Sequence, residues 1–410
     1  MLNRGLSILL RGLGLLSRLL LFISLGYFLV PEEVGRFGQT AATISFLVYI
    51  LGADFYIITN RDLCVAEAAE KLGILKQSLP VFALTYLCTA GFLAWLFIHD
   101  FLPIELAFII VIILIFEHLG QESYRILIAL GHPVLASLSI FLRLGAWAII
   151  ISILMFIDER MRNLESVMAA WAIGNSLAAV VGLKVLSRLP RSGWQKPFAF
   201  RWIRAGLRIS APYLLATLCL RSLSTLDRFF VEYFTTAATV GAYVLYAGVG
   251  AAVPAFVDAA LVSFATPKLL KFASTGDVKS FELEFRKLRN HCFLATTVLA
   301  TGAAASIIVA SYYFEHEIYR EHIGMAILVL GAFMISTVSS VYNLELYAYR
   351  LDTDIIKSHF LGVVLFFAAI AVLAPIKGWL VVPLSLIVAQ TGILASKLLS
   401  VRQRRKRTFN

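Results

Sequence analysis

Two pairs of arginines inside apolar segments are the residues in this chain best suited to chemistry. Arg11 and Arg18 lie seven residues apart in the first long apolar segment, and Arg221 and Arg228 lie seven apart in a later one. Seven residues make about two helical turns, so each pair points from one helix face. Charge inside a bilayer is costly and by default indicates function. Guanidinium groups bind phosphate oxygens through paired donors, so the spacing favours an anionic cargo.

Acidic side chains also fall inside the apolar segments. Asp54, Glu117, Asp227 and Asp258 are candidates for an ion-coupling site or a gate, because carboxylates in low-dielectric surroundings can hold a proton or Na⁺. The more ordinary interpretation, which we favour for each, is a salt-bridge partner or a residue near the membrane interface. Likewise, His118 beside Glu117 fits a proton relay, but such a pair is more often a satisfied buried contact.

The composition requires a membrane to accommodate these segments. The chain has 410 residues, of which 60% are hydrophobic and only 15% charged, and its apolar runs are near the ~20 residues that span a bilayer. Strand-like alternation is absent over most of the chain, so helices satisfy the backbone. We predict an all-α integral membrane protein with about twelve transmembrane helices: Leu6–Val30, Gly35–Ile58, Ser78–Ile98, Leu102–Tyr124, Val134–Ile157, Glu165–Ser187, Leu207–Val231, Thr239–Phe264, Asn290–Tyr313, Ile323–Leu346, Ser358–Ala374 and Trp379–Leu399.

The net charge of +11 is distributed unevenly between the two sides of this topology. The even-numbered connections and the tail carry most of the Lys and Arg, which places both termini and all long loops in the cytoplasm. The tail sequence RQRRKR is then a topology anchor that can contact anionic lipid head groups. Because this asymmetry explains the basic run, we expect no nucleic-acid partner. No Gly-rich phosphate loop or metal-ligand spacing occurs, so neither ATP hydrolysis nor a metal site is expected.

The chain also shows signs of an internal duplication. The polar break at 188–204 divides the predicted spans six and six, and each half begins with an arginine pair. The outward turns PEEVGRF and AATVGAY correspond, and Asp54 and Asp258 each lie late in a second span. We therefore predict two parallel repeats. Their bounds are a six-helix lobe at 1–187, a cytoplasmic inter-lobe loop at 188–206, a second six-helix lobe at 207–399 and a basic tail at 400–410.

Several of these segments together resemble a known family. The opening SRLLLFISLGYFLVPEEVGRFGQ, the turn IALGHP and the run SLSTLDRFFVEYFTTAATVGAYVLYAGV are similar to the polysaccharide transporter (O-antigen flippase-like) family. This family belongs to the multidrug/oligosaccharidyl-lipid/polysaccharide exporter superfamily. The stretch Leu226–Phe229, followed by the Gly-x-Tyr turn, is the most specific part of the resemblance.

The resemblance implies two six-helix lobes around a central cavity that opens alternately to each side. It also implies a flippase, not an enzyme, that moves an isoprenoid-diphosphate-linked oligosaccharide, such as an O-antigen unit, across the cytoplasmic (inner) membrane of a bacterium. Arg18 and Arg228 match arginines that line the cavity in relatives. Arg11 and Arg221 match no family motif, and they are candidates only because each lies seven residues from a matched arginine on the same helix face. We expect no cofactor, and the energy source stays open between H⁺ or Na⁺ as a coupling ion, the membrane potential and downstream consumption of the glycan. The expected partners are the lipid-linked glycan, membrane lipids and a glycan polymerase or other envelope-assembly proteins.

Three other functions remain open. A multidrug or organic-cation exporter of the same superfamily would favour an acidic, aromatic cavity, whereas this one is expected to be basic. A membrane-embedded glycan polymerase or ligase should have a large outer loop with catalytic residues, and the outer loops here are short. A non-transporting scaffold would leave the intramembrane charges unexplained.

Overall fold

Helices make up most of the described chain. The computed structural model describes residues 2–409, with side chains except those of residues 2–5, 8, 11 and 406–409, and these residues contain no strand. Within them, eleven helical segments are long and apolar enough to cross a bilayer. Helix α1 (Leu2–Phe28) adds a shorter apolar stretch, Gly12–Phe28. The predicted all-α membrane fold with about twelve spanning helices is confirmed.

The chain divides into two compact units. The first unit comprises Met1–Leu29 and Arg36–Leu218, and the second comprises Val30–Gly35 and Cys219–Asn410. Two long helices, α2 (Pro31–Gly52) and α10 (Phe200–Phe234), begin in one unit and end in the other. These units are defined by which residues contact each other, whereas the predicted lobes were defined by counting six spans in each half. The predicted lobe boundaries therefore stay a prediction.

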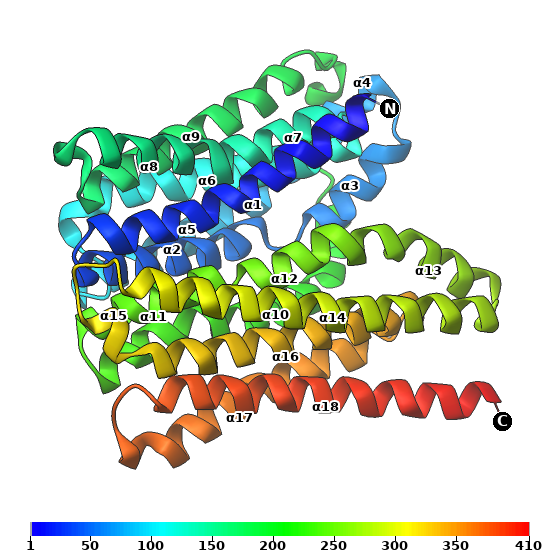
Figure 1. The fold of residues 1–410 in the computed structure, drawn as a ribbon. Coiled ribbons are helices and arrows are strands. Elements are labelled where there is room, and N and C mark those ends of the chain that lie inside the picture. The colour runs from blue at the N-terminus through cyan, green and yellow to red at the C-terminus, as the bar shows by residue number, and fades with distance from the viewer. Residues whose placement is uncertain (1, 410) are drawn as a thin grey trace. The chain divides into compact units, whose positions relative to one another are not determined.

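The first unit contains helices that follow predicted spans one to six, several of them interrupted. Helix α6 packs against α7 and α9, and α1 packs against α7 and α8 (Figure 1). Proline starts α7, and the Asn163 side chain caps α9 by accepting a hydrogen bond from the Ser166 N–H at 2.9 Å. Besides α1, α2 and the first part of α10, the elements are α3 (Tyr56–Val65), α4 (Ala68–Lys76), α5 (Leu79–Ile98), η1 (Ile104–Leu106), α6 (Ala107–Ala129), α7 (Pro133–Phe141), η2 (Leu142–Ala146), α8 (Trp147–Ile157), η3 (Glu159–Met161), α9 (Leu164–Leu186) and η4 (Arg191–Gln195).

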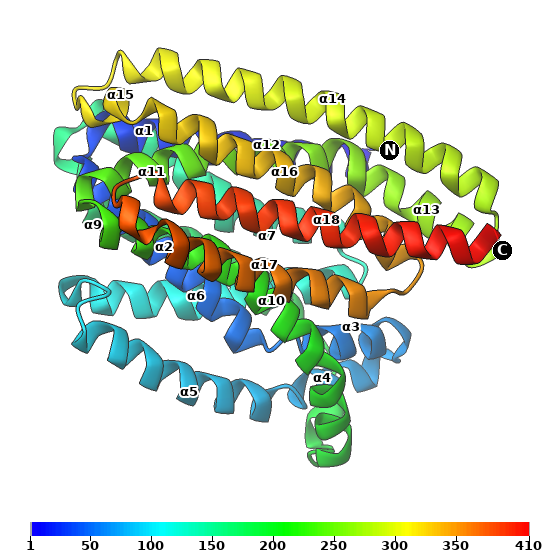
Figure 2. The same ribbon diagram turned by 90° about the horizontal axis from the view of Figure 1, so that it is seen from below.

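In the second unit, α18 lies beside α16 and α17, and α14 lies beside α16 (Figures 1 and 2). A buried cluster that includes Phe281, Phe285 and Leu288 fills the space between α13, α14 and α16. The elements after α10 are α11 (Ala237–Gly250), α12 (Ala252–Val257), η5 (Asp258–Val262), α13 (Ser263–Thr275), α14 (Val278–Ser311), α15 (Ile318–Glu321), α16 (Ile323–Ala348), α17 (Asp352–Leu373), η6 (Ala374–Ile376) and α18 (Val381–Phe409).

The two outward turns that correspond in the sequence pack directly against each other. A Cβ added to Gly35 would lie 3.0 Å from the Ala237 carbonyl oxygen, and one added to Gly241 would lie 2.0 Å from the Pro31 carbonyl oxygen. Both glycines are therefore required for the close approach of the α2 and α11 N-termini. The two turns are thus in contact, and the predicted duplication of the chain stays a prediction.

The predicted inter-lobe loop is docked on the first unit. The backbones of Gly73 in α4 and Gly193 in η4 touch, because a Cβ on either glycine would meet the other residue at 2.7 Å. Lys196 pairs with Glu70 at 2.8 Å, and the Trp202 indole N–H donates to Asp62 at 2.8 Å. This segment is therefore a fixed part of the first unit and not a free linker.

The basic tail continues α18 and is partly held by the protein. Arg404 and Arg405 bind Glu345 of α16, with N–O distances of 2.5 and 3.0 Å, and both also reach Glu282 of α14. The sequence predicted that the tail could contact lipid head groups. Two of its arginines neutralise acids of their own unit, and contact of the tail with lipid head groups stays a prediction.

Candidate functional site

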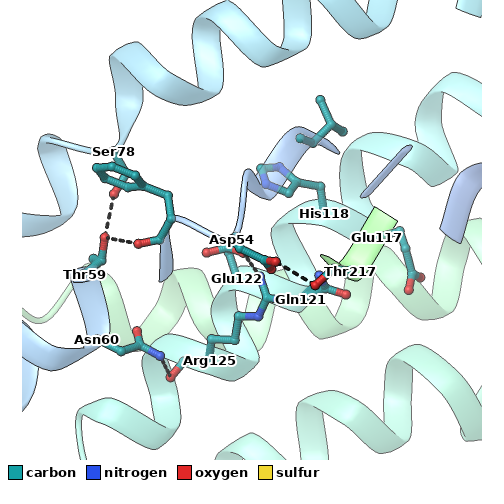
Figure 3. Close-up of polar contacts among 12 residues, drawn as sticks. Asp54, Thr59, Asn60, Ser78, Glu117, His118, Gln121, Glu122, Arg125 and Thr217 are labelled. Atoms are coloured by element: carbon teal, nitrogen blue, oxygen red, sulfur yellow. Dashed lines mark hydrogen bonds and ion pairs between the residues drawn. The ribbon is translucent and has the colours of Figure 1, made fainter. Parts of the chain in front are cut away.

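The strongest concentration of buried polar groups lies on one face of α6 in the first unit. Glu117, His118, Gln121 and Glu122 recur at helical spacing, and all are buried although the helix is otherwise apolar. Arg125 continues the same face one turn further along (Figure 3). Buried ionisable groups in a spanning helix are expensive, so this face is the primary candidate for function.

A break in the second predicted span places Asp54 beside this face. Helix α2 ends at Gly52, and Ala53 and Asp54 both adopt left-handed backbone conformations, with φ of 48° and 47°. Non-glycine residues rarely adopt this conformation, which costs about 1–2 kcal/mol per residue. The Asp54 carboxylate accepts a hydrogen bond from the Thr217 hydroxyl at 2.9 Å and lies near Glu122 (Figure 3). Asp54, predicted as a coupling or gate residue, is thus buried at a helix joint.

Glu122 and Arg125 form an ion pair that connects α6 to α3. The Arg125 Nη1 lies 2.5 Å from Glu122 Oε1, and the guanidinium carbon lies 3.7 Å from the centre of the Tyr56 ring. The Asn60 side chain also donates to the Arg125 carbonyl oxygen at 3.4 Å (Figure 3). Arg125 therefore fastens α3 to α6 by stacking and by backbone contact.

Next to this pair, His118 has one satisfied and one unsatisfied ring nitrogen. Its Nδ1 lies 2.9 Å from the Tyr86 hydroxyl on α5, whereas its Nε2 is buried without a partner. A Cβ on Gly52 would lie 3.3 Å from Glu122 Oε1 and 3.9 Å from His118 Nε2. Because Gly52 has no side chain, a small space remains at this position, and Glu122 Oε1 and His118 Nε2 both face it.

A second buried pair lies on the same helix face. Arg143 Nη1 is 3.2 Å from Glu117 Oε1 and donates to Gln121 Oε1 at 3.3 Å. Arg143 belongs to η2, a π-helical segment inside the fifth span, and π segments are frequent at functional sites. The sequence interpretation missed Arg143, although an arginine within an apolar run is the same signal that singled out Arg18. Glu117, a predicted coupling residue, is thus neutralised within the unit.

The first arginine pair is only partly described. The Arg11 side chain lies outside the described part of the chain, whereas Arg18 is exposed. Leu9, Leu13, Leu16 and Leu20 form an exposed apolar stripe on α1. Arg18 lies two residues from Leu16 and Leu20, which is about 160–200° around the helix from that stripe. Helix α1 therefore exposes two different faces, one apolar and one basic.

The second arginine pair lies on α10 in the second unit. Asp227 accepts hydrogen bonds from the Tyr243 hydroxyl at 2.5 Å and from the Arg228 N–H at 2.8 Å, and the Arg228 Nη1 lies 3.5 Å from the same carboxylate. Arg228 also donates to the Ser224 carbonyl oxygen. The pairing of Arg228 with Asp227, one of the alternatives from the sequence, is present. Arg221 is half-buried, and its substrate role stays a prediction.

Asp258, the predicted counterpart of Asp54, has a different environment. It is exposed and begins η5, a π-helical interruption of the eighth span. Both aspartates thus lie where a second span is broken, but only Asp54 is buried and hydrogen-bonded to a neighbouring helix. A gate or coupling role for Asp258 stays a prediction.

Comparisons with known proteins identify the fold. No family model and no curated protein sequence matches the chain. Its structure is similar to an inward-facing multidrug resistance MATE family transporter of the MOP superfamily, with a TM-score of 0.73, 13% identity, and coverage of 96% of this chain and 94% of that one. It is also similar to the lipid II flippase MurJ in an inward closed conformation, with a TM-score of 0.75, 14% identity, and coverage of 98% and 87%.

A third similar structure is a point mutant of the Vibrio cholerae MATE transporter VcmN, with a TM-score of 0.59, 15% identity, and coverage of 99% and 98%. The chain therefore has the fold of these transporters, which is the fold that the resemblance in the sequence implied. These neighbours are transporters and a flippase, and none of the three is an enzyme.

Proposed function

We propose that the protein is a flippase that moves an isoprenoid-diphosphate-linked oligosaccharide across the cytoplasmic membrane of a bacterium. The observation that carries this proposal is the exposed Arg18 on the face of α1 opposite the apolar stripe. An apolar stripe suits lipid tails, whereas an exposed guanidinium on the opposite face can bind phosphate oxygens. The similarity to a lipid II flippase supports a lipid-linked cargo.

In this proposal the diphosphate binds to arginines while the isoprenoid tail stays in the bilayer. Arg18, Arg221 and Arg228 are the proposed contacts, and the Asp227 carboxylate offsets part of the charge of Arg228. Arg11 shares the helix face of Arg18 by spacing. An H⁺ or Na⁺ gradient supplies the energy, and a glycan polymerase or other envelope-assembly protein receives the product.

The test is flipping of a fluorescent isoprenoid-diphosphate oligosaccharide in proteoliposomes. Arg18→Ala and Arg221→Ala are expected to reduce the flipping rate at least about tenfold, equivalent to ~1.4 kcal/mol of lost charge-assisted binding per site. Arg188→Ala is the matched control, because Arg188 is exposed in the segment after α9. An equal loss in all three variants would argue against specific phosphate contacts.

For Arg228 the single variant is ambiguous, since Arg228→Ala leaves a buried Asp227 without its cation. The double variant Asp227→Asn/Arg228→Gln removes both charges together. If it flips normally while Arg228→Ala does not, the pair is structural and Arg228 does not bind cargo.

A second candidate function is export of organic cations. The observation that favours it is the acidic excess at the α2–α3 joint, where Asp54 and Glu122 face one cation, Arg125. The similarity to MATE transporters is consistent with it. Saturable uptake of a cationic dye into inside-out vesicles, lost in Asp54→Asn and unaffected by Arg18→Ala, would support the exporter over the flippase.

A further inference from the structure

The buried groups at the joint of α2 and α3 do not balance in charge. Asp54 and Glu122 contribute two negative charges, and Arg125 contributes one positive charge. The adjacent pair of Glu117 and Arg143 is neutral by itself and leaves this excess unchanged. A net charge at a buried site is costly, so the joint is electrically balanced only when it holds one further positive charge.

The structure also shows where such a charge would be held. His118 is 1% exposed, and its Nε2 is buried without a partner. This nitrogen and Glu122 Oε1 both lie within 4 Å of the position that a Gly52 Cβ would occupy, so they face one small space. The Tyr86 hydroxyl already satisfies Nδ1 in either tautomer, which leaves Nε2 as the open atom.

The open atom indicates which cation fits. Na⁺ and K⁺ are hard cations that bind sets of oxygens, whereas an imidazole nitrogen binds a proton well. Within the described residues, no group of three or more His, Cys, Asp and Glu side chains is arranged to hold a metal ion. The Arg125 guanidinium lies in the same space, 3.4 Å from the Gly52 Cβ position, and would repel a bound metal ion.

Glu122 also controls a mechanical connection. It orients Arg125, which stacks on Tyr56, and Asn60 of the same helix donates to the Arg125 carbonyl oxygen. Helix α3 follows directly after the left-handed residues Ala53 and Asp54. The ion pair of Glu122 and Arg125 therefore fastens the short helix α3, which begins at a strained joint, to the long helix α6.

We propose that His118, Glu122 and Asp54 form a binding site for a single proton, and that occupancy of this site releases α3 from α6. The proton comes from water and is shared by the Glu122 carboxylate and His118 Nε2. When Glu122 is protonated it loses its ion pair with Arg125, the guanidinium turns towards Asp54, and its stacking on Tyr56 is lost. This proposal names H⁺ as the coupling ion of the proposed transport function. The proton site itself does not depend on that function, whereas its use in driving transport does.

Other ionisable groups around the joint do not replace this site. Glu117 is bound by Arg143, and phenols titrate near pH 10, outside the working range. Thr217, the contact from α10, does not titrate. The charged and titratable groups that face the joint are Tyr49, Asp54 and Tyr56 from the α2–α3 segment, Tyr86 from α5, Glu117, His118, Glu122 and Arg125 from α6, and Arg143 from η2.

The test measures the position of α3 directly, without any substrate. Cys64 is exposed on α3, and Leu183 is exposed on α9, which packs against α6. Spin labels at Cys64 and at Leu183→Cys, with the other three cysteines replaced, report the distance between α3 and the fixed helices. Lowering the pH from ~8 to ~5 is expected to shift the population from a short to a longer distance.

The size of the response tests the number of protons. Uptake of one proton changes the ratio of the two populations by at most about tenfold per pH unit. We expect Glu122→Gln to show the long distance at every pH and His118→Gln to lose most of the pH response. The double variant Glu117→Gln/Arg143→Gln removes the adjacent neutral pair together, is the matched control, and is expected to retain the response.

Four outcomes would overturn the proposal: no pH response, a response that survives in Glu122→Gln, a steeper dependence than one proton allows, or a shift produced by Na⁺ at constant pH. The readout separates this inference from the proposed flippase function. A pH response in a protein that flips no lipid-linked glycan would leave the proton site standing, whereas flipping without a pH response would leave only the transport function.

Discussion

Removing the two arginines that bind Glu345 is expected to destabilise the second unit strongly. The Glu345 side chain is fully buried, and it accepts hydrogen bonds from Arg404 at 2.5 Å and from Arg405 at 3.1 and 3.0 Å. In Arg404→Gln/Arg405→Gln this carboxylate stays buried with no cation. We expect α16 and α18 to separate at the ends that carry Glu345 and the two arginines before the rest of the unit unfolds.

The magnitude follows from the burial of each partner. Attraction between unit charges at 4 Å is about 4 kcal/mol at an effective dielectric constant of 20, and breaking a buried pair from one side typically costs about 3–5 kcal/mol. Arg404 is 9% exposed and should contribute most of this loss. Arg405 is 31% exposed, so solvent screening reduces its share to about 1 kcal/mol or less.

Reversible unfolding in mixed micelles of a mild detergent and dodecyl sulfate measures these differences. The control is Arg402→Gln, which removes one positive charge, against two in the double variant, at an exposed position of the same helix and should change stability by less than about 0.5 kcal/mol. A double variant that loses no more stability than Arg402→Gln would refute the reasoning, because the ion pairs would then contribute nothing beyond net charge.

Three further predictions concern local features. Gly241→Ala places a Cβ 2.0 Å from the Pro31 carbonyl oxygen and should lower stability by about 1–3 kcal/mol, measured by the same unfolding assay. Asn163→Ala removes the cap of α9 and should cost about 1 kcal/mol, whereas Asn163→Asp, which keeps the acceptor, should cost little. A hydrogen bond from Ser280 lowers the pKa of the Asp277 carboxyl, so its stabilisation is complete above the usual aspartate range and is lost as the pH falls through the lowered value. Asp277→Asn should therefore flatten the acid side of the curve of thermal midpoint against pH, and an unchanged curve would contradict this assignment.

Much of the fold followed from the sequence because membrane topology depends on local properties. Segment length and hydropathy predicted about twelve spanning helices, and the structure has eleven such segments plus the shorter apolar stretch of α1. The matched turns at Gly35 and Gly241 were also visible as a sequence repeat, and the structure shows them in contact. The breaks at Asp54 and Asp258 were not predicted, since left-handed residues and π segments have weak sequence signals.

The candidate site was predicted less completely. The sequence singled out Asp54, Glu117 and His118 as separate residues, and the structure brings them to one region of the first unit (Figure 3). Glu122 lies near the inner end of its predicted span, where a charge is a weaker signal, and Arg143 was missed. Both turn out to be ion-pair members, and a helical pattern alone carries no information about the partner on another helix.

Composition and segment length were enough to show that this chain is a helical membrane protein with charges in its spans. The reason is that the transfer of a segment into a bilayer depends on the length and apolar surface of that segment alone. Which of those charges are neutralised depends on how the helices pack. Arg143 cancels Glu117, and Arg404 and Arg405 cancel Glu345, whereas Asp54 and Glu122 share one arginine. Ion pairing depends on distances of a few ångströms between helices far apart in the chain, and packing alone sets those distances.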